Sequence, residues 1–383
     1  VGPLRIAIDA TAVPRQMAGA GVYTYQLVRA LARLANEHRL LVFARPGLFD
    51  DLSGEQLRVL HVDPPSPAAR LAWEQTALPL LLRRLRIDVL HSPHHHTPLA
   101  ARLDAAGDAR RPRLVVTFHD VTFLLLRDRY PLARRLYMEG VSRAAARIAD
   151  AIITPSETVR RDVIDKLGVP AERVVAIAEA AGPHFAPVDD DTVGRVRWKH
   201  RLPSRYILSV GSLEPGKNRG RLILAYRQLK MNGIDCPLVV AGQPAWRYEG
   251  DFELVRGLGL RDEITFLGYV PDDELPALYS GAALLAFPSL YEGFGLPVLE
   301  AMACGTPVVA SNVSATAEVA GDAALLIDPR DVDALAAAMG RVLSDEALRA
   351  DLRTRGLERA AQFSWERAAR ETLFLYELVA AKG

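Results

Sequence analysis

The chain has 383 residues, of which 50% are hydrophobic and 24% charged, a balance that is typical of folded globular proteins and excludes wholesale disorder. Its 47 Lys and Arg residues nearly equal its 46 Asp and Glu residues, which excludes a dedicated nucleic-acid binder. The two cysteines, Cys236 and Cys304, have no CxxC spacing, which excludes a disulfide framework and a zinc knuckle.

Short runs of Val, Ile and Leu alternate with longer segments of helical period, as in α/β proteins with mostly parallel strands. In the first half we expect strands at Leu4–Asp9, Arg39–Ala44, Val59–Val62, Val89–His91, Arg113–Phe118, Ala151–Thr154 and Val174–Ile177. In the second half we expect them at Tyr206–Val210, Leu238–Ala241, Ile264–Phe266, Ala283–Ala286, Pro307–Ala310 and Ala324–Asp328.

This pattern predicts two Rossmann-like, doubly wound domains, residues 1–181 and 205–363. The polar stretch 182–204, which contains Pro and Asp, is predicted to be a linker. The tail from Asp331 to Ala381 is predicted to form three helices with no strand between them. Two such domains place a cleft between them, and ligands bind at the carboxyl ends of the strands.

The segment Phe287–Ala310 carries the most specific pattern in the sequence. A buried strand ends, a loop with Glu292 follows, and a helix opens at Pro297 with Glu300 on its first turn. The free N–H groups of a helix N-terminus bind phosphate, and two carboxylates beside that site suit the hydroxyls of a sugar. The alternative is that Glu300 only complements the helix dipole and Glu292 is a solvated loop residue.

This segment resembles the E-x7-E signature of retaining glycosyltransferases of the GT-B fold, in particular family four. The resemblance implies that Glu300 binds ribose hydroxyls of a sugar nucleotide and that Glu292 contacts the transferred sugar. It implies that sugar and diphosphate are held by the backbone around Gly293, Phe294, Gly295 and Leu296. It also implies that residues 1–181 bind the acceptor and 205–363 the donor, and that the last helix, 364–383, packs back onto the first domain.

The loop Ser209–Asn218 resembles the family's G-[TR]-x-x-P-x-K-N loop, whose cations bind the donor diphosphate. The resemblance assigns Gly211 and Lys217 to donor binding. Lys217 is one of five lysines beside 42 arginines in the chain, and a compact ammonium group suits a phosphate. The alternative is an exposed loop lysine without a ligand.

Many relatives carry an arginine in this loop, at places that here are Ser212 and Gly216. We therefore expect Arg219 or Arg221 to supply the missing charge at the diphosphate. The same departure makes a second function possible, a sugar-nucleotide-binding protein that has lost catalysis.

In the first domain, the family places glycines equivalent to Gly19 and Gly21 where the backbone approaches the donor. The alternative is an ordinary turn that enters a helix. His119 ends the predicted strand Arg113–Phe118, and the family's T-x-H-D pattern assigns it a contact with the donor. The alternative is a structural histidine.

A metal ion is not expected. The pattern contains a histidine cluster at His91, His94, His95 and His96. These histidines lack the i, i+4 spacing of a metal-binding helix and have no nearby acidic residue in the sequence. Asp331 and Asp333 match the letters of a D-x-D motif, but they open a helix, and we expect Asp331 to be its N-cap.

Residues 1–181 have a net charge of +6 and residues 182–383 one of −5. One basic stretch interleaves apolar residues with arginines, namely Arg127, Arg129, Arg134, Arg135, Arg143 and Arg147. Such a stretch suits peripheral contact with an anionic membrane, steering of a phosphorylated acceptor, or merely a solvated face. With no run of 18 apolar residues and no signal pattern, we expect a cytoplasmic protein. Peripheral contact with the inner membrane face is one alternative, and the solvated face is slightly favoured over it.

We therefore expect a metal-independent GT-B enzyme that moves a hexose from a nucleoside diphosphate sugar to an acceptor hydroxyl in glycan or glycolipid assembly. Related chains with the T-x-H-D and G-Y-V-P patterns include many mannosyltransferases, so the resemblance favours GDP-mannose, followed by UDP-sugars. No cofactor and no nucleic acid is expected. The remaining alternatives are a nucleotide-sugar epimerase and a pyridoxal-dependent phosphorylase of the same fold.

Overall fold

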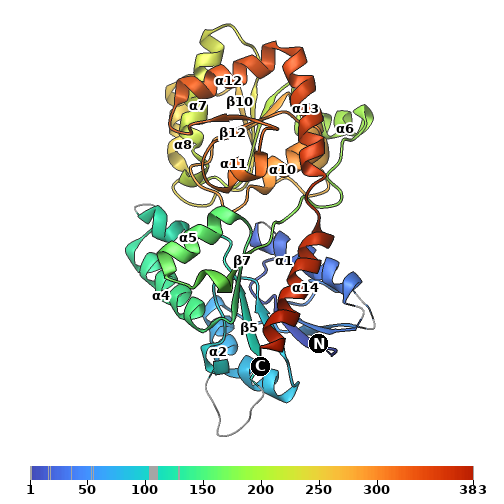
Figure 1. Cartoon of the computed structure of the whole chain (residues 1–383). Helices are drawn as coiled ribbons and strands as arrows, with labels where there is room; N and C mark the ends of the chain where they lie inside the picture. Colours follow the sequence, from blue (N-terminus) through green and yellow to red (C-terminus); the bar gives the residue numbers. More distant parts are fainter. Residues whose placement is uncertain are drawn as a thin grey trace. The chain divides into compact units, whose positions relative to one another are not determined.

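The computed structural model describes residues 2–15, 17, 19–35, 37–52, 54, 56–102, 111–127 and 130–382 (Figure 1). Arg129 of the basic stretch lies outside these ranges. The chain divides into two units. Unit 1 is Val1–Glu179 together with Trp365–Gly383, and unit 2 is Ala180–Ser364.

Unit 1 is built on a seven-stranded parallel sheet with the order β3-β2-β1-β4-β5-β6-β7. Its strands are β1 (Arg5–Asp9), β2 (Arg39–Ala44), β3 (Leu57–His61), β4 (Val89–Ser92), β5 (Arg113–Thr117), β6 (Ala151–Thr154) and β7 (Val174–Ala176). Each expected strand is present, with ends shifted by at most two residues. The central strands are buried along nearly their whole length, as strands covered on both faces must be.

The helices of unit 1 are α1 (Ala20–Leu34), α2 (Pro67–Arg84), α3 (Thr122–Leu125), α4 (Leu132–Ile148), α5 (Glu157–Leu167) and α14 (Trp365–Ala381). Short 3-10 helices lie at Leu99–Arg102 and Ala171–Arg173. The last helix, α14, packs against α1 (Figure 1), because its apolar face buries Ala369, Leu373 and Tyr376. The end of the chain is therefore part of unit 1.

Unit 2 has a six-stranded parallel sheet with the order β10-β9-β8-β11-β12-β13. Its strands are β8 (Ile207–Val210), β9 (Leu238–Ala241), β10 (Ile264–Gly268), β11 (Leu284–Phe287), β12 (Val308–Ser311) and β13 (Leu325–Ile327). Its helices are α6 (Asp190–His200), α7 (Arg219–Met231), α8 (Glu249–Gly257), α9 (Leu275–Ser280), α10 (Leu296–Ala303), α11 (Ser314–Ala320), α12 (Val332–Ser344) and α13 (Glu346–Ala360), with a 3-10 helix at Pro215–Lys217.

The segment predicted to be a linker, 182–204, contains a helix. The side chain of Asp189 accepts a hydrogen bond from the backbone N–H of Thr192 at 2.7 Å and caps the N-terminus of α6. Val193 and Val196 are buried, and α6 packs against α9. The segment expected to link the two units thus belongs to unit 2 and contains a helix, because its acidic run caps and begins α6.

Asp331 caps α12 in the same way, since its side chain accepts from the backbone N–H of Ala334 at 2.8 Å. This confirms the interpretation of the D-x-D letters as a helix start.

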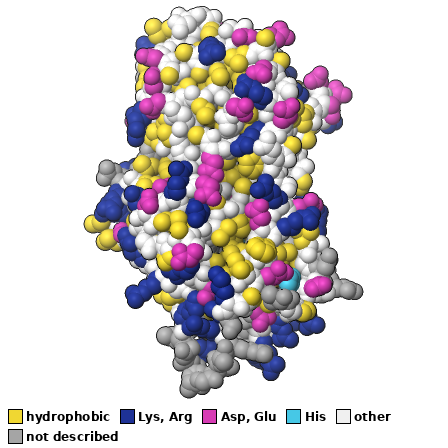
Figure 2. All heavy atoms as spheres, in the orientation of Figure 1, with side chains coloured by type: hydrophobic (Ala, Val, Ile, Leu, Met, Phe, Trp, Pro, Cys, Tyr) yellow, Lys and Arg dark blue, Asp and Glu magenta, His cyan; other side chains and the backbone are white. Residues whose placement is uncertain are grey.

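None of the helices in the described ranges combines enough length with enough apolar character to span a lipid bilayer. Hydrophobic and basic side chains lie next to each other on the surface of unit 1 that carries α4 (Figure 2). Leu132, Leu136 and Tyr137 of α4 are exposed.

In each sheet the strand order reverses at one point. In unit 1 this switch point lies between β1 and β4, and in unit 2 between β8 and β11. Ligands of doubly wound sheets bind outside the carboxyl ends of the strands at such points. The switch points are therefore where each unit is expected to hold its ligand.

Candidate active site

The two sequence segments predicted to bind the donor meet at the switch point of unit 2. The loop that starts at Gly211 leaves the carboxyl end of β8, and the loop that starts at Pro288 leaves the carboxyl end of β11. Because β8 and β11 are paired neighbours, both loops lie at one edge of the sheet. The backbone N–H of Leu290 donates to the carbonyl of Gly216 at 3.0 Å and joins the two loops.

The first loop is shaped by a close approach of backbone segments. Gly211 has a φ of 133° and Gly242, which follows β9, has a φ of 149°. A Cβ atom at Gly242 would lie 1.9 Å from the carbonyl oxygen of Gly211, so only glycine fits there. A Cβ atom at Gly211 would lie 3.1 Å from Cε of Lys217. The start of the loop therefore packs closely against the Lys217 side chain.

The ammonium group of Lys217 lies 2.6 Å from Oε1 of Glu292. The side chains are 17% and 15% exposed, respectively, and the ammonium group also lies 5.4 Å from the ring centre of Phe287. The cation predicted at the diphosphate and the carboxylate predicted at the sugar thus contact each other. This partly buried pair places one positive and one negative group side by side at the carboxyl edge of the unit 2 sheet.

Arg219 differs from its expected role. Its guanidinium donates to the carbonyls of Ser212, at 2.6 Å, and Gly211, and the residue is only 2% exposed. Burial lowers the pKa of Arg219 to about 10. The side chain was expected to contact the diphosphate, but here it holds the shape of the Gly211 loop, because two loop carbonyls left without strand partners need a donor.

Arg221, the other arginine expected to compensate, donates to Oδ1 of Asn218 at 2.9 Å. Asn218 in turn donates to the carbonyls of Pro288, at 3.0 Å, and Pro329, at 2.6 Å. It adopts a left-handed conformation with a φ of 57°. These bonds tie the start of α7 to the ends of β11 and β13.

The second loop is anchored on both sides. Ser311 donates to the carbonyl of Ser289 at 2.6 Å, and Ser314 Oγ accepts from the backbone N–H of Glu292 at 3.0 Å. The loop ends at Gly295, which has a φ of 105° and is the N-cap of α10. The predicted backbone residues Gly293, Phe294 and Leu296 lie directly around this helix start, with the Phe294 side chain buried.

Two buried hydroxyl groups of these segments, Oγ of Ser289 and Oγ1 of Thr316, have no hydrogen-bond partner among the described residues. Thr316 Oγ1 lies 3.8 Å from the position of a Cβ atom on Gly295. Buried hydroxyl groups are nearly always paired, so each of these two can still form a hydrogen bond.

Glu300 was expected on the first turn of α10. It is the fifth residue of that helix and lies beyond the first turn. The helix begins at Leu296, one residue before Pro297, so Glu300 is too far along the helix to cap its N-terminus. Its Oε2 accepts a hydrogen bond from Tyr279 at 2.8 Å. Burial and the adjacent carboxylate raise the pKa of Tyr279 well above its usual value, so this hydroxyl stays a donor and orients Glu300. Sequence reasoning missed Tyr279, because it lies in α9, a separate short helix.

In unit 1 the structure brings His119 close to the helix that follows Gly19 and Gly21. Gly19 is the N-cap of α1 with a φ of 49°, and Gly21 lies in its first turn. The ring of Tyr23, in the same helix, meets the ring of His119 edge-on, with centroids 4.8 Å apart. His119 Nε2 donates to the carbonyl of Pro93 at 3.1 Å.

Glu179 is a partner of His119 that sequence reasoning missed. Its Oε1 lies 3.4 Å from Nδ1 of His119, and its side chain is 5% exposed. With a carbonyl on one ring nitrogen and a carboxylate near the other, the His119 ring is held in a fixed orientation. No pattern in the sequence links Glu179 to His119, because the two belong to separate strand ends.

The four clustered histidines have different surroundings. The ring nitrogens of His91 lie 2.6 Å from Tyr376 Oη and 2.7 Å from Thr117 Oγ1, and burial lowers its pKa to about 3. Burial also lowers the pKa of His95 to about 4, and its ring packs against Phe118. Burial therefore favours the neutral form of both His91 and His95.

Two parallel, doubly wound units are the architecture of the GT-B fold of glycosyltransferases. Solved structures with this fold align along almost the whole chain. Sucrose-phosphate synthase from Thermosynechococcus elongatus has a TM-score of 0.79 and 24% identity, covering 99% of this chain and 100% of that one. HepE from Anabaena, in complex with UDP-glucose, has a TM-score of 0.78 and 19% identity, covering 98% and 99%.

Two family models match the chain. Residues 17–179 match "Glycosyltransferase Family 4", and residues 193–359 match "Glycosyl transferases group 1". O-antigen chain mannosyltransferase B of Escherichia coli is 36% identical over 91% of this chain and 85% of its own length. The serotype-specific mannosyltransferase WbdA of E. coli is 36% identical over 67% of this chain, a match that spans 32% of WbdA. The chain belongs to glycosyltransferase family 4 and is a glycosyltransferase that acts in glycan assembly.

Proposed function

We propose that this enzyme transfers a mannosyl unit from GDP-mannose to a hydroxyl group of a glycan or lipid-linked acceptor, with retention of the anomeric configuration. The observation that carries the proposal is the 2.6 Å pair of Lys217 and Glu292 beside the start of α10. A cation and a helix N-terminus suit a diphosphate, and a carboxylate suits sugar hydroxyls. The two E. coli relatives, both mannosyltransferases, support mannose as the sugar.

In unit 2, each donor group has a proposed partner. Glu300, oriented by Tyr279, binds the ribose hydroxyls. Glu292 binds hydroxyls of the transferred sugar, and Lys217 binds the diphosphate together with the backbone of residues 293–296. Gly211 lets the loop pass close to these groups, and Arg219 keeps that loop in shape through its carbonyls.

The reaction breaks the bond between the sugar and the diphosphate oxygen while the acceptor oxygen bonds to the same face of the sugar, and the proton of the acceptor hydroxyl passes to the leaving diphosphate. Negative charge grows on the leaving diphosphate, and Lys217 and the start of α10 stabilise it. In unit 1, we assign to His119 a hydrogen bond to the donor and to the backbone at Gly19 and Gly21 a close approach to it. No metal ion takes part at the diphosphate in this proposal.

A donor screen tests the proposal. GDP-, UDP-, ADP- and dTDP-sugars are added in a thermal-shift assay, where a ligand at 100 times its Kd adds about 2.7 kcal/mol of stability. We expect GDP-mannose to give the largest shift and to be consumed with an acceptor glycan, giving an α-mannoside by NMR. A β-mannoside contradicts retention. Donor binding with neither transfer nor hydrolysis indicates a binding protein that has lost catalysis.

We also propose that α4 contacts the inner membrane face, where lipid-linked acceptors are found. Leu132 and Leu136 are 59% and 57% exposed on a helix that also carries Arg134 and Arg135, a combination that suits an anionic surface. Co-sedimentation with anionic vesicles, but not with neutral ones, is expected for the protein and not for a Leu132→Glu/Leu136→Glu variant. Equal binding by both proteins contradicts the role of α4.

A further inference from the structure

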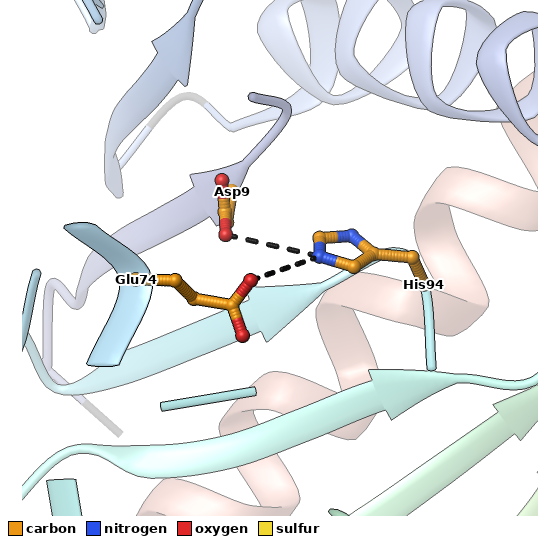
Figure 3. Close-up of side chains that lie close together, drawn as sticks. All are labelled: Asp9, Glu74 and His94. Carbon is orange, nitrogen blue, oxygen red and sulfur yellow. Dashed lines mark ion pairs between the residues drawn. The ribbon is translucent and has the colours of Figure 1, made fainter. Parts of the chain in front are cut away.

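A group of three metal-ligating side chains lies at the switch point of unit 1 (Figure 3). Asp9 is the last residue of β1, and His94 follows the end of the neighbouring strand β4. Glu74 reaches the same place from α2. Figure 3 shows the His94 ring pointing between the two carboxylates. Residues from three separate elements thus converge where a doubly wound sheet binds its ligands.

The distances between His94 and the two carboxylates fit a cation bound between them better than direct hydrogen bonds. Nε2 of His94 lies 3.8 Å from Oδ2 of Asp9 and 3.7 Å from Oε2 of Glu74. Both distances are too long for hydrogen bonds, and they are almost equal. The three ligand atoms all lie within 4.8 Å of one another. A cation about 2.1 Å from each ligand separates neighbouring ligands by about 3–4 Å.

Two of the three ligand atoms have no hydrogen-bond partner. Oδ2 of Asp9 and Nε2 of His94 are buried and, among the described residues, make no hydrogen bond. Asp9 is fully buried, and its other oxygen, Oδ1, accepts from the backbone N–H of Thr11 at 3.1 Å and the Thr11 hydroxyl at 2.6 Å. Asp9 is thus fixed so that its unpaired oxygen faces His94, as a metal ligand held by outer hydrogen bonds would be.

Glu74 has the same kind of support. Its side chain is fully buried, its Oε2 accepts from Arg70 at 2.9 Å, and its Oε1 accepts from Gln75 at 3.1 Å. A carboxylate oxygen has a second lone pair, so Oε2 can accept from Arg70 and still bind a cation. Arg70 alone does not balance two buried carboxylates.

We propose that Asp9, Glu74 and His94 bind one divalent transition-metal ion, of which Zn²⁺ is the best match. Two carboxylates with one imidazole form a mixed oxygen and nitrogen set of the kind that Zn²⁺ accepts. Three protein ligands leave a coordination position for water or a substrate oxygen. This site lies in unit 1, on different residues from those proposed to hold the diphosphate, and the proposal stands independently of the donor's identity.

The competing explanation is a protonated His94 that pairs with both carboxylates. Charge-assisted hydrogen bonds from an imidazolium are about 2.7–2.9 Å long, which neither contact approaches. One N–H also points at one acceptor, whereas Nε2 lies almost equally far from both oxygens. The two explanations differ in what happens when a metal ion is added.

Equilibrium dialysis against micromolar ZnSO4, with bound zinc measured by mass spectrometry, tests the proposal on the intact chain. We expect the wild type to bind about one zinc ion per chain. We expect neither Asp9→Asn nor His94→Gln to bind it. The matched control is His61→Gln, because His61 forms another histidine–carboxylate contact of unit 1, 3.5 Å from Asp50, with both side chains about half exposed. The control is expected to keep its zinc.

Thermal melting separates lost binding from lost folding. Saturating Zn²⁺ is expected to raise the Tm of the wild type and of His61→Gln by about 5–10 °C, and to leave Asp9→Asn and His94→Gln unchanged. In chelator, Asp9→Asn is expected to melt at or above the wild-type temperature, because it removes a buried unbalanced charge. No zinc above the background of the dialysis buffer, or equal zinc in the wild type and His94→Gln, overturns the proposal.

Discussion

Lys217 Nζ and Glu292 Oε1 lie 2.6 Å apart at the switch point of unit 2, although 75 positions separate the two residues in the sequence. They belong to two different loops, and we propose that Lys217 binds the diphosphate and Glu292 the transferred sugar. In the absence of a donor, Lys217 and Glu292 neutralise each other. We expect Lys217 to stabilise the diphosphate fully only when the diphosphate replaces Glu292 as its partner. Four predictions follow from this geometry and its neighbours.

Lys217→Ala is expected to lower turnover more than it weakens substrate binding. Negative charge builds on the leaving diphosphate as the sugar bond breaks, so the ammonium matters most in the transition state. The expected loss is about 2–3 kcal/mol, or about 30- to 150-fold in kcat. Lys199→Ala is the control, because Lys199 is an exposed lysine of unit 2 paired with Glu274, and it should leave kcat unchanged. Full activity in Lys217→Ala would move the diphosphate contact to Arg221 or His119.

Glu292→Gln is expected to leave the affinity for GDP intact or higher, while turnover falls. The substitution removes the carboxylate that lies 2.6 Å from Lys217, so the lysine is free to bind diphosphate, but the contact with the transferred sugar is weakened. Isothermal titration with GDP and steady-state kinetics with the sugar nucleotide separate the two effects. A loss of GDP affinity equal to that of Glu300→Gln would show that the two carboxylates do not divide the donor between them.

Glu300→Gln is expected to weaken GDP and GDP-mannose equally, by about 1–3 kcal/mol, because an amide loses charge-assisted bonds to the ribose hydroxyls. Tyr279→Phe offers a graded comparison. It removes the 2.8 Å hydrogen bond that orients Glu300 but keeps the carboxylate, so its loss of affinity should be smaller. The measurement is the Kd of both nucleotides by titration. Unchanged affinity for GDP in Glu300→Gln would remove Glu300 from the ribose role.

The strands could be predicted because a parallel strand buried on both faces is a continuous apolar run, as Leu238–Ala241 and Leu284–Phe287 are. The two loops at the switch point of unit 2 could be located from the sequence because their glycines and charged residues are close together along the chain. The role of Arg219 could not. Its burial depends on where the carbonyls of Gly211 and Ser212 point, which no local pattern records.

Contacts between residues of distant elements also could not be predicted from the sequence. Tyr279 meets Glu300, and Glu179 meets His119, only after separate elements pack together. Asp9 and Glu74 likewise come close to His94 only after β1, α2 and the end of β4 pack together. We judged the histidine cluster to be without acidic neighbours because none is near in the sequence, yet β1 and α2 bring two carboxylates to His94.

The corrected role of Arg219 leads to the last prediction. Arg219→Met keeps the length of the side chain but leaves the carbonyls of Gly211 and Ser212 without their donor, so unit 2 is expected to lose about 2–4 kcal/mol of unfolding free energy. Arg227→Met is the matched control, because Arg227 is an exposed arginine of the same helix, α7, and it should leave stability within about 0.5 kcal/mol. Urea unfolding of both variants gives the first readout, and GDP affinity under native conditions gives the second. A positioning role predicts a large loss of stability, with the GDP affinity of the fraction that remains folded reduced less than in Lys217→Ala. Arg219→Met with wild-type stability and weak GDP binding would instead return Arg219 to direct contact with the diphosphate, as the sequence alone suggested.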